Sequence, residues 1–443
     1  MQVKATYKDI SKVAWPVIIG SMAQAILNLI DTVFLGRVDE LTLAAAAIGI
    51  TFYLTFTLLC MGMAVGVQVI IARRTGEGDH AQVGYVFDQG QYLLFTFGLF
   101  LFLIMRIFAP TILSLTLSSE KVYAAAIDFL NIRSFGVLFV SLNMVYRALY
   151  IGLSNTKVLV YTTFLMAVIN IVLDYLLIFG KGPFPEMGIK GAALASVVAE
   201  AFALIFFISF TRFAHNFRKY SIYSFQKLSF DIISRIVRIS YPMVFQNFFS
   251  IASWFVFFIL IEKSGEDQLA ASNVIRSLLL LMMFPVWGLA ATANTMVSNL
   301  LGQNLSSKLP LLLKRIYLFS VLWILLFGLI IIINPSLLLQ IVTDEAHLII
   351  LAQKPFYVLY MSMFIFIPGV LLLHTLIGTG DTRAAFIIEI MAIVVYLTHT
   401  YLAAIVYQLE LTYIWASEFS YWGVVCLLCF IRLKSRKWKK IVV

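Results

Sequence analysis

The chain has 443 residues, of which 62% are hydrophobic and only 12% are charged, and its net charge is +10. A soluble domain carries roughly 25% charged residues, so this chain has too few of them to cover a surface that faces water. The composition predicts an integral membrane protein, with its excess positive charge in loops on the cytoplasmic side. It argues against a soluble enzyme, a nucleic-acid-binding protein and a pump that carries its own nucleotide-driven motor.

Twelve long apolar segments follow one another along the chain. A helix that crosses a membrane needs about 20 apolar residues, and continuous apolar runs favour helices over the short alternating strands of a β-barrel. We therefore predict an all-α integral membrane fold. Its transmembrane helices cover residues 14–36, 44–72, 86–112, 122–150, 158–180, 189–211, 237–261, 270–299, 311–333, 346–376, 384–407 and 412–432.

The connections between these helices alternate in charge. The N-terminus and the connection after every second helix are basic, whereas the remaining connections are acidic or mixed. Basic connections stay in the cytoplasm, so both termini are predicted to be cytoplasmic. The protein is then a multi-pass protein of the cell (inner) membrane.

The longest polar connection divides the chain in half. We predict an N-lobe over residues 1–211, a cytoplasmic linker over 212–236 and a C-lobe over 237–443, with six transmembrane helices in each lobe.

The two halves also match each other in sequence. At a constant offset of 226 residues, Trp15-Pro16 falls on Tyr241-Pro242 and Gly152 falls on Gly378. A shared offset indicates an internal duplication. Six helices return the chain to the same side, so the two repeats are parallel, and we expect transport through a central cavity between them.

Polar side chains recur on one face of the first helix and one face of the fifth. Gln24, Asn28 and Asp31 have the spacing of one helical face, and so do Asn170 and Asp174. An ionisable group in mid-membrane costs about 2.5–3.5 kcal/mol, so each needs a reason to be there. Two carboxyl groups in a poorly hydrated pocket can hold a proton, or bind Na⁺ with amide oxygens as further ligands. The alternative is that Asp31 caps or pairs near a helix end.

Other polar residues lie inside the predicted helices. The candidates to line a substrate cavity are Asn143, Glu200, Gln246 and Ser250, together with Gln24 and Asn28 from the first helix. Glu200 either joins the acidic cluster or hydrogen-bonds another helix, and Arg133 is a further cavity candidate.

Glu389 and Arg276 are the main charged residues inside the helices of the second half. We interpret Glu389 as paired with Arg276, or as satisfied near Arg383 at the cytoplasmic end.

Pro16 lies fifteen residues before Asp31 in the first helix, which is about 22 Å along a helix axis. Proline removes a helix hydrogen bond and permits bending. A bend coupled to the state of Asp31 and a static kink are both compatible with the sequence.

These segments resemble the multidrug and toxic compound extrusion (MATE) family. The matching strings are DTVFLG from Asp31, GLSNTK from Gly152, NIVLD from Asn170, GIKGAALAS from Gly188 and GTGDTR from Gly378. The resemblance covers nearly the whole chain. It implies two six-helix lobes that form a V-shaped cavity, and export of amphipathic organic cations in exchange for H⁺ or Na⁺.

The same resemblance implies roles for individual residues. Asp31, Asn170 and Asp174 match the family's N-lobe cation site, which makes them a possible Na⁺ site. The hydroxyl group of Ser196 is implied to assist them, and Pro16 occupies the position of the family's bending proline.

The chain departs from one branch of the family. That branch carries an acid in the seventh helix, where this chain has Ser250, and no acid occurs in the tenth helix. The chain is more similar to the DinF-like branch, whose coupling lies in the N-lobe.

We therefore predict a secondary active antiporter that works by alternating access. No covalent chemistry is implied, so the protein is expected not to be an enzyme and to need no cofactor besides H⁺ or Na⁺ as coupling ion. Its expected partners are small organic cations and the lipid bilayer, without nucleic acid, and a monomer is expected.

Two alternatives remain at this level. The first is a flippase for a lipid-linked oligosaccharide or another lipid cargo, which a cavity rich in Arg and Lys would favour. The second is an ion channel or passive pore, which saturable counterflow in vesicles would distinguish from a carrier.

Overall fold

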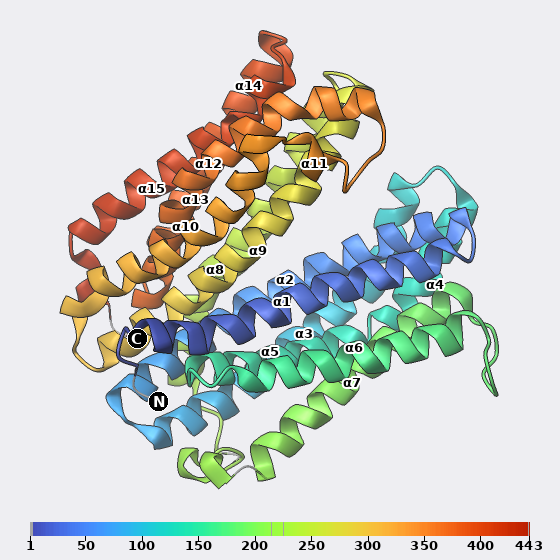
Figure 1. Cartoon of the computed structure of the whole chain (residues 1–443). Helices are drawn as coiled ribbons and strands as arrows, with labels where there is room; N and C mark the ends of the chain where they lie inside the picture. Colours follow the sequence, from blue (N-terminus) through green and yellow to red (C-terminus); the bar gives the residue numbers. More distant parts are fainter. Residues whose placement is uncertain (1–2, 214, 225, 442) are drawn as a thin grey trace. The chain divides into compact units, whose positions relative to one another are not determined.

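The computed structural model describes residues 3–213, 215–224, 226–441 and 443, without the side chains of Ala25, Asn28, Leu29, His215, Asn216, Arg218, Ile332 and Lys440. Within this described part the chain forms helices and no strands (Figure 1). The first half contains α1 (Tyr7–Gly36), α2 (Glu40–Glu77), α3 (His80–Thr116), α4 (Glu120–Arg133), α5 (Gly136–Gly152), α6 (Lys157–Ile178), α7 (Gly188–Phe213) and η1 (His215–Tyr220). The second half contains α8 (Phe230–Glu262), α9 (Glu266–Gly302), η2 (Ser306–Lys308), α10 (Leu309–Ile333), α11 (Ser336–Leu339), α12 (Ala346–Thr379), α13 (Thr382–Tyr401), η3 (Leu402–Val406), α14 (Leu411–Trp415), α15 (Ser417–Lys434) and η4 (Lys437–Lys440).

The predicted all-α membrane fold is confirmed. Among the described residues, ten helical segments are long and apolar enough to cross a membrane, and the bent pair α4–α5 makes an eleventh candidate. The remaining predicted span, 14–36, lies within the 30-residue helix α1. Every predicted span therefore corresponds to one helix or to consecutive helical pieces.

Most helices extend beyond the predicted spans, because polar residues continue them on either side of the apolar run. At the start of α2, Asp39 accepts a hydrogen bond from the backbone N–H of Thr42 at 2.7 Å and another from its hydroxyl group at 2.9 Å. These bonds satisfy a free donor at the helix end and lower the pKa of Asp39, so its carboxylate stays charged in this short connection.

The fourth predicted span is not one straight helix. It breaks between Arg133 and Gly136, where α4 and α5 meet at a bend of 47°. The prediction of a continuous helix over 122–150 is wrong at this point. Both sides of the break are apolar enough for a single span, so hydropathy alone gives no sign of it.

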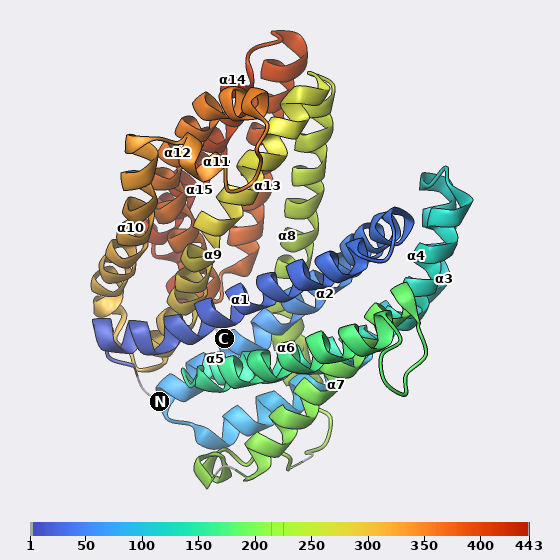
Figure 2. The same ribbon diagram turned by 45° about the vertical axis from the view of Figure 1, so that its right-hand side comes forward.

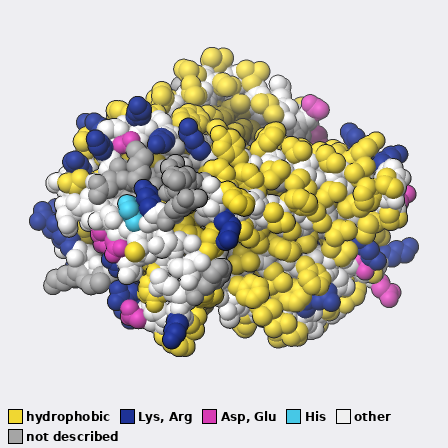
Figure 3. Space-filling model, turned by 90° about the horizontal axis from the view of Figure 1, so that it is seen from below, with side chains coloured by type: hydrophobic (Ala, Val, Ile, Leu, Met, Phe, Trp, Pro, Cys, Tyr) yellow, Lys and Arg dark blue, Asp and Glu magenta, His cyan; other side chains and the backbone are white. Residues whose placement is uncertain are grey.

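One face of α10 shows how the exterior suits lipid. Leu322, Leu329 and Ile333 are 59%, 64% and 80% exposed, whereas Ile316 and Ile324 are fully buried. Large apolar side chains exposed along a whole helix face are stable in a hydrocarbon environment and costly in water. On the face drawn in Figure 3, hydrophobic side chains cover a wide continuous area, and lysine and arginine side chains gather near its borders.

The chain forms two compact units. One comprises residues 15–244, and the other comprises residues 2–14 together with 245–443. In the first unit α6 packs on α7 and α2 on α5; in the second α9 packs on α12 and α13 on α15 (Figures 1 and 2). The predicted lobe boundaries at 211 and 237 stay predictions.

The chain passes between the units inside two helices. The passages lie between residues 14 and 15 of α1 and between residues 244 and 245 of α8. Each lies within three residues of a helix-internal proline, Pro16 in α1 and Pro242 in α8. These prolines are also equivalent under the 226-residue offset.

Candidate functional site

The acids of α1 and α6 meet inside the first unit. Asn170 and Asp174 are 1% and 0% exposed, and the Asn170 side-chain Nδ2 donates to Asp174 Oδ2 at 3.1 Å. Asp174 also makes a carboxyl–carboxyl hydrogen-bonding contact with Asp31. The structure thus brings together the three residues that helical spacing and the family resemblance singled out.

This contact cannot be made by two ionised groups. Oδ1 of Asp31 and Oδ1 of Asp174 are both buried and have no other hydrogen-bond donor in the described part of the chain. Two carboxylates at hydrogen-bonding distance repel each other strongly in a poorly hydrated site. The pair needs either a shared proton or a bound cation.

A second buried cluster joins α2, α4 and α7. Arg133 forms a two-pronged ion pair with Glu200, with Nη2–Oε1 at 2.6 Å and Nη1–Oε2 at 2.8 Å. The Tyr53 hydroxyl donates to Glu200 at 3.2 Å, and the Arg133 guanidinium lies 3.6 Å from the centre of the Tyr53 ring. Glu200 is therefore engaged by other helices, one of the two roles that the sequence left open.

The two clusters form one electrostatic network. The positive charge of Arg133 acts on both Asp31 and Asp174, and Glu200 acts on Asp31. Three carboxyl groups therefore share one guanidinium group. A single proton on the Asp31–Asp174 pair still leaves the network with one net negative charge, which suits a cationic ligand.

The break between α4 and α5 makes room for this network. A Cβ atom on Gly136 would overlap Arg133 Nη1 and Glu200 Oε2, and it would come within 2.8 Å of the Tyr53 hydroxyl. Only a residue without a side chain lets the backbone pass so close to the ion pair.

We expect Gly136→Ala to destabilise the protein by about 1–3 kcal/mol, because the methyl group overpacks the site and must displace the hydrogen-bonded atoms of Arg133 and Glu200. The measurement is thermal unfolding of the purified protein in detergent. Gly423→Ala is the matched control: a Cβ there has open space around it, so alanine should leave stability unchanged or raise it slightly. Equal melting temperatures for Gly136→Ala and Gly423→Ala would contradict the close packing.

Other predicted residues of the first unit lie near this network or apart from it. Asn143 is buried on α5, and its Nδ2 donates to the backbone oxygen of Glu200 at 3.0 Å. Ser196 is half-buried on α7 and makes no hydrogen bond in the described part. Gln24 is half-buried on α1, and the Asn28 side chain lies outside the described residues.

The polar residues of α8 belong to the second unit. Gln246 is half-buried, with a buried Oε1 that no donor reaches in the described residues. Ser250 donates to Glu389 Oε1 at 2.8 Å.

The pairing predicted for Glu389 is wrong. Its hydrogen-bond partners are Ser250 of α8 and Tyr421 of α15, and no ion pair involves it among the described residues. Arg276 instead lies over an aromatic ring of α8, at 5.0 Å from its centre. Arg383, the alternative partner, is not among the groups that act on Glu389 in the described part of the chain.

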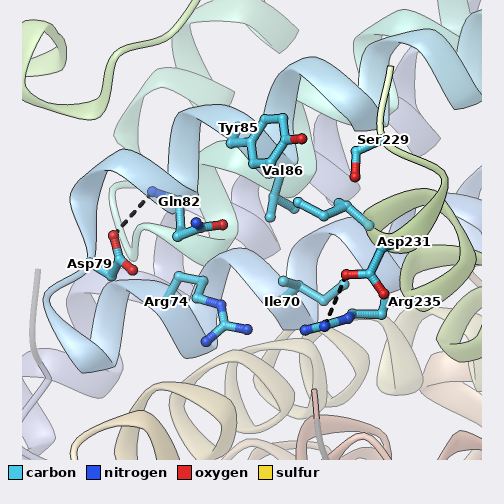
Figure 4. A pocket seen from close by; sticks show the side chains of 10 residues that line it. Ile70, Arg74, Asp79, Gln82, Tyr85, Val86, Ser229, Asp231 and Arg235 are labelled. Atoms are coloured by element: carbon cyan, nitrogen blue, oxygen red, sulfur yellow. Dashed lines mark hydrogen bonds and ion pairs between the residues drawn. The ribbon is translucent and has the colours of Figure 1, made fainter. Parts of the chain in front are cut away.

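A pocket of about 310 Å³ lies on the side of the basic connections, at the ends of α2, α3 and α8 (Figure 4). Both of its arginines are already paired, Arg74 with Glu77 at 2.7 Å and Arg235 with Asp231 at 2.9 Å, and Asp79 accepts a hydrogen bond from the backbone N–H of Gln82 at 3.2 Å. This pocket holds none of the predicted site residues, so we do not assign it a role in transport.

Comparison with known proteins identifies what the whole chain resembles. The MatE family model matches residues 16–176 and again residues 242–402. The two matches begin 226 residues apart, the offset found in the sequence. The internal duplication is therefore also present in the family pattern.

Curated relatives match most of the chain. A probable multidrug resistance protein NorM of Idiomarina loihiensis is 24% identical over 350 residues, which is 79% of this chain and 76% of the relative. A probable multidrug resistance protein NorM of Thermotoga maritima is 23% identical over 391 residues, 87% of this chain and 83% of the relative.

Solved structures share the fold. A MOP superfamily transporter from Pyrococcus furiosus has a TM-score of 0.87 at 19% identity, with 98% of this chain and 97% of that chain covered. An outward-facing multidrug resistance MATE family transporter has a TM-score of 0.89 at 19% identity, with the same coverage. At these identities the likeness establishes the fold alone.

Proposed function

The chain belongs to the MATE family of transporters, and we propose that it exports amphipathic organic cations in exchange for protons, by alternating access. The family assignment makes it a multi-pass membrane transporter rather than an enzyme, in a family that needs no cofactor. The proton, the cationic substrates and the alternating access are our proposal. So are the location in the inner membrane and the cytoplasmic termini, which rest on the alternating charge of the connections, and the monomeric state.

The observation that carries the proposal is the contact between Asp31 and Asp174. A proton taken up by this pair removes the repulsion between the two carboxyl groups, and its release restores a negative site. An organic cation is attracted to that negative site, and its binding opposes reprotonation. Because the proton and the organic cation compete for the same site, the inward movement of protons is coupled to the outward movement of the organic cation.

The donor set favours H⁺ over Na⁺. A sodium ion needs several oxygen ligands. Here Asn170 presents its N–H group rather than its oxygen to Asp174, and the carboxyl groups face each other.

The flippase alternative is not favoured. A pyrophosphate-linked cargo calls for unpaired basic groups, and the family and its NorM relatives point to multidrug resistance instead. Arg133, one of the two deepest basic residues, is neutralised by Glu200 at 2.6 Å.

Counterflow of ethidium in proteoliposomes tests the transport activity itself. Vesicles loaded with unlabelled organic cation should accumulate external ethidium transiently, at a rate that saturates with ethidium concentration. A carrier shows this stimulation because its substrate-loaded binding site reorients across the membrane faster than its empty binding site does. Ethidium entry that rises linearly with ethidium concentration and does not depend on the internal cation would indicate a pore and would contradict the proposal.

We propose that Pro16 is the helix-bending residue of the transport cycle. Proline removes a backbone hydrogen bond inside α1 at the passage between the two units, so alanine should restore the bond and stiffen the helix. Pro16→Ala is expected to bind ethidium with unchanged affinity and to transport it at least about tenfold more slowly, a barrier increase of about 1.4 kcal/mol.

Pro242→Ala is the matched variant, because Pro242 holds the equivalent position in α8. A decrease in both variants would indicate bending at both passages. Normal transport by Pro16→Ala would show that the kink of α1 is static.

A further inference from the structure

The second unit contains a buried carboxyl group that the proposed function does not use. Glu389 of α13 is 3% exposed. Its Oε1 accepts hydrogen bonds from the hydroxyl groups of Ser250 on α8 and Tyr421 on α15. Its Oε2 is buried and has no hydrogen-bond partner in the described residues.

In the described part of the chain, no lysine, arginine or histidine is among the groups that act on Glu389. The titratable groups that interact with it are Tyr421 and Cys429 of α15, and Glu418 of the same helix acts on Tyr421. An ionised carboxylate buried in this way is costly, and a neutral carboxylic acid is not.

A second glutamate extends the cluster. Glu418 is 4% exposed and accepts a hydrogen bond from the Trp422 indole N–H at 3.1 Å, and the Tyr396 hydroxyl approaches its carboxyl group. Tyr421 lies within electrostatic range of both glutamates. Two acids and two tyrosines are therefore gathered in this part of the second unit.

The duplication makes this arrangement informative. Under the 226-residue offset, α8 and α13 are the equivalents of α1 and α6, the helices that carry Asp31 and Asp174. The positions equivalent to those acids are Phe257 and Thr400, and Phe257 packs in an aromatic cluster with Tyr396. In each repeat, therefore, a protonatable carboxyl group lies at the contact between the two equivalent helices, α1 and α6 in the first repeat and α8 and α13 in the second.

The carboxyl group lies at a different position along the helix in each repeat. Glu389 lies eleven residues before Thr400, which is about 16 Å along a helix axis. The carboxyl group of the second repeat is therefore not a degenerate copy of Asp174. It is a separate group, with its own hydrogen-bond donors.

We propose that Glu389 is a second proton-binding site, distinct from the Asp31–Asp174 pair, which takes a proton from water on Oε2 and returns it to water. Ser250 and Tyr421 hold Oε1 as the carbonyl oxygen of the acid, and Ser250, which is half-buried, connects the site to the less buried face of α8. The site goes beyond the proposed coupling in the first unit and does not depend on it.

Infrared difference spectroscopy between acidic and alkaline pH tests this on the resting full-length protein without substrate. The wild type should show a carboxylic acid C=O band that disappears as pH rises. Glu389→Gln should lose one component of that band, while Asp31→Asn and Asp174→Asn should keep it. The exposed Glu345 is the control, since Glu345→Gln should leave this component unchanged.

Tyr421→Phe keeps the proposal testable if Glu389→Gln does not fold. It should retain the component at a higher frequency, because the C=O group loses one hydrogen bond. Identical bands in Glu389→Gln and wild type at every pH, or an unshifted component in Tyr421→Phe, would overturn the proposal. Loss of the component on addition of Na⁺ at constant pH would also overturn it, since the ligand would then be sodium.

Because the experiment uses no transported substrate, its outcome is independent of the antiport proposal. A Glu389 component without ethidium transport would leave the second site intact, and ethidium transport without that component would remove the second site alone.

Discussion

Asp174→Asn is expected to reduce gradient-driven export of an organic cation to the rate seen with no gradient, while the protein stays folded. Asparagine has nearly the same shape as aspartate, and its side-chain oxygen can still accept the 3.1 Å hydrogen bond from Asn170. It cannot bind and release a proton in the relevant pH range. The expected defect is therefore in coupling rather than in structure, and uptake by proteoliposomes under an imposed pH gradient measures it.

Stability should not fall in this variant. Asp174 is fully buried, and a neutral amide removes the repulsion with Asp31 and the cost of burying a charge. Asp128→Asn is the matched control, because Asp128 pairs with Lys190 at 3.0 Å in an exposed position and should be neutral in transport and in stability. Full pH-driven transport by Asp174→Asn would remove Asp174 from the coupling mechanism.

Arg133→Met is expected to cost about 3–5 kcal/mol of stability, the largest loss among the substitutions considered. The change leaves Glu200 buried at 7% exposure without its cation, and an unpaired buried charge is far more costly than a missing pair. It also removes the guanidinium group that packs on the Tyr53 ring. The measurement is chemical or thermal unfolding in detergent.

The double variant Arg133→Met with Glu200→Gln separates these causes. It removes both charges, so it should recover most of the lost stability. If Arg133→Met alone is as stable as the wild type, the buried ion pair does not hold the first unit together. If the double variant is no better than the single one, the loss comes from packing on Tyr53 rather than from charge.

The helices and the duplication could be predicted from the sequence because both depend on local or periodic information. A span such as α3 is recognised by its apolar length, and the match of Pro16 with Pro242 requires only a constant offset. The break between Arg133 and Gly136 could not be predicted in this way. It depends on how closely Gly136 approaches an ion pair whose other member lies on a different helix.

In the candidate site, too, helical spacing predicts only contacts between residues that are close in sequence. Asn170 and Asp174 are one turn apart, so helical spacing alone places them together. Arg133 and Glu200 are 67 residues apart in sequence, and no spacing rule connects them. One signal could have found the pair: the two residues are opposite charges inside apolar spans of the same half, and a buried charge needs a partner.

The same reasoning failed for Glu389, where it suggested Arg276. The structure supplies hydroxyl groups from α8 and α15 instead of a cation. Charge balance predicts a partner only when both groups are ionised, and a neutral carboxylic acid needs none. Glu200 is paired with Arg133, whereas Glu389 has only hydroxyl partners among the described residues.

The most direct test of the central claim is ethidium movement in proteoliposomes under a pH gradient alone, a Na⁺ gradient alone and neither, with wild type beside Asp31→Asn. Proton coupling at the Asp31–Asp174 pair predicts movement driven by the pH gradient without Na⁺, and loss of that movement in Asp31→Asn. Movement driven only by the Na⁺ gradient, or equal movement in wild type and Asp31→Asn, would contradict proton coupling at the Asp31–Asp174 pair.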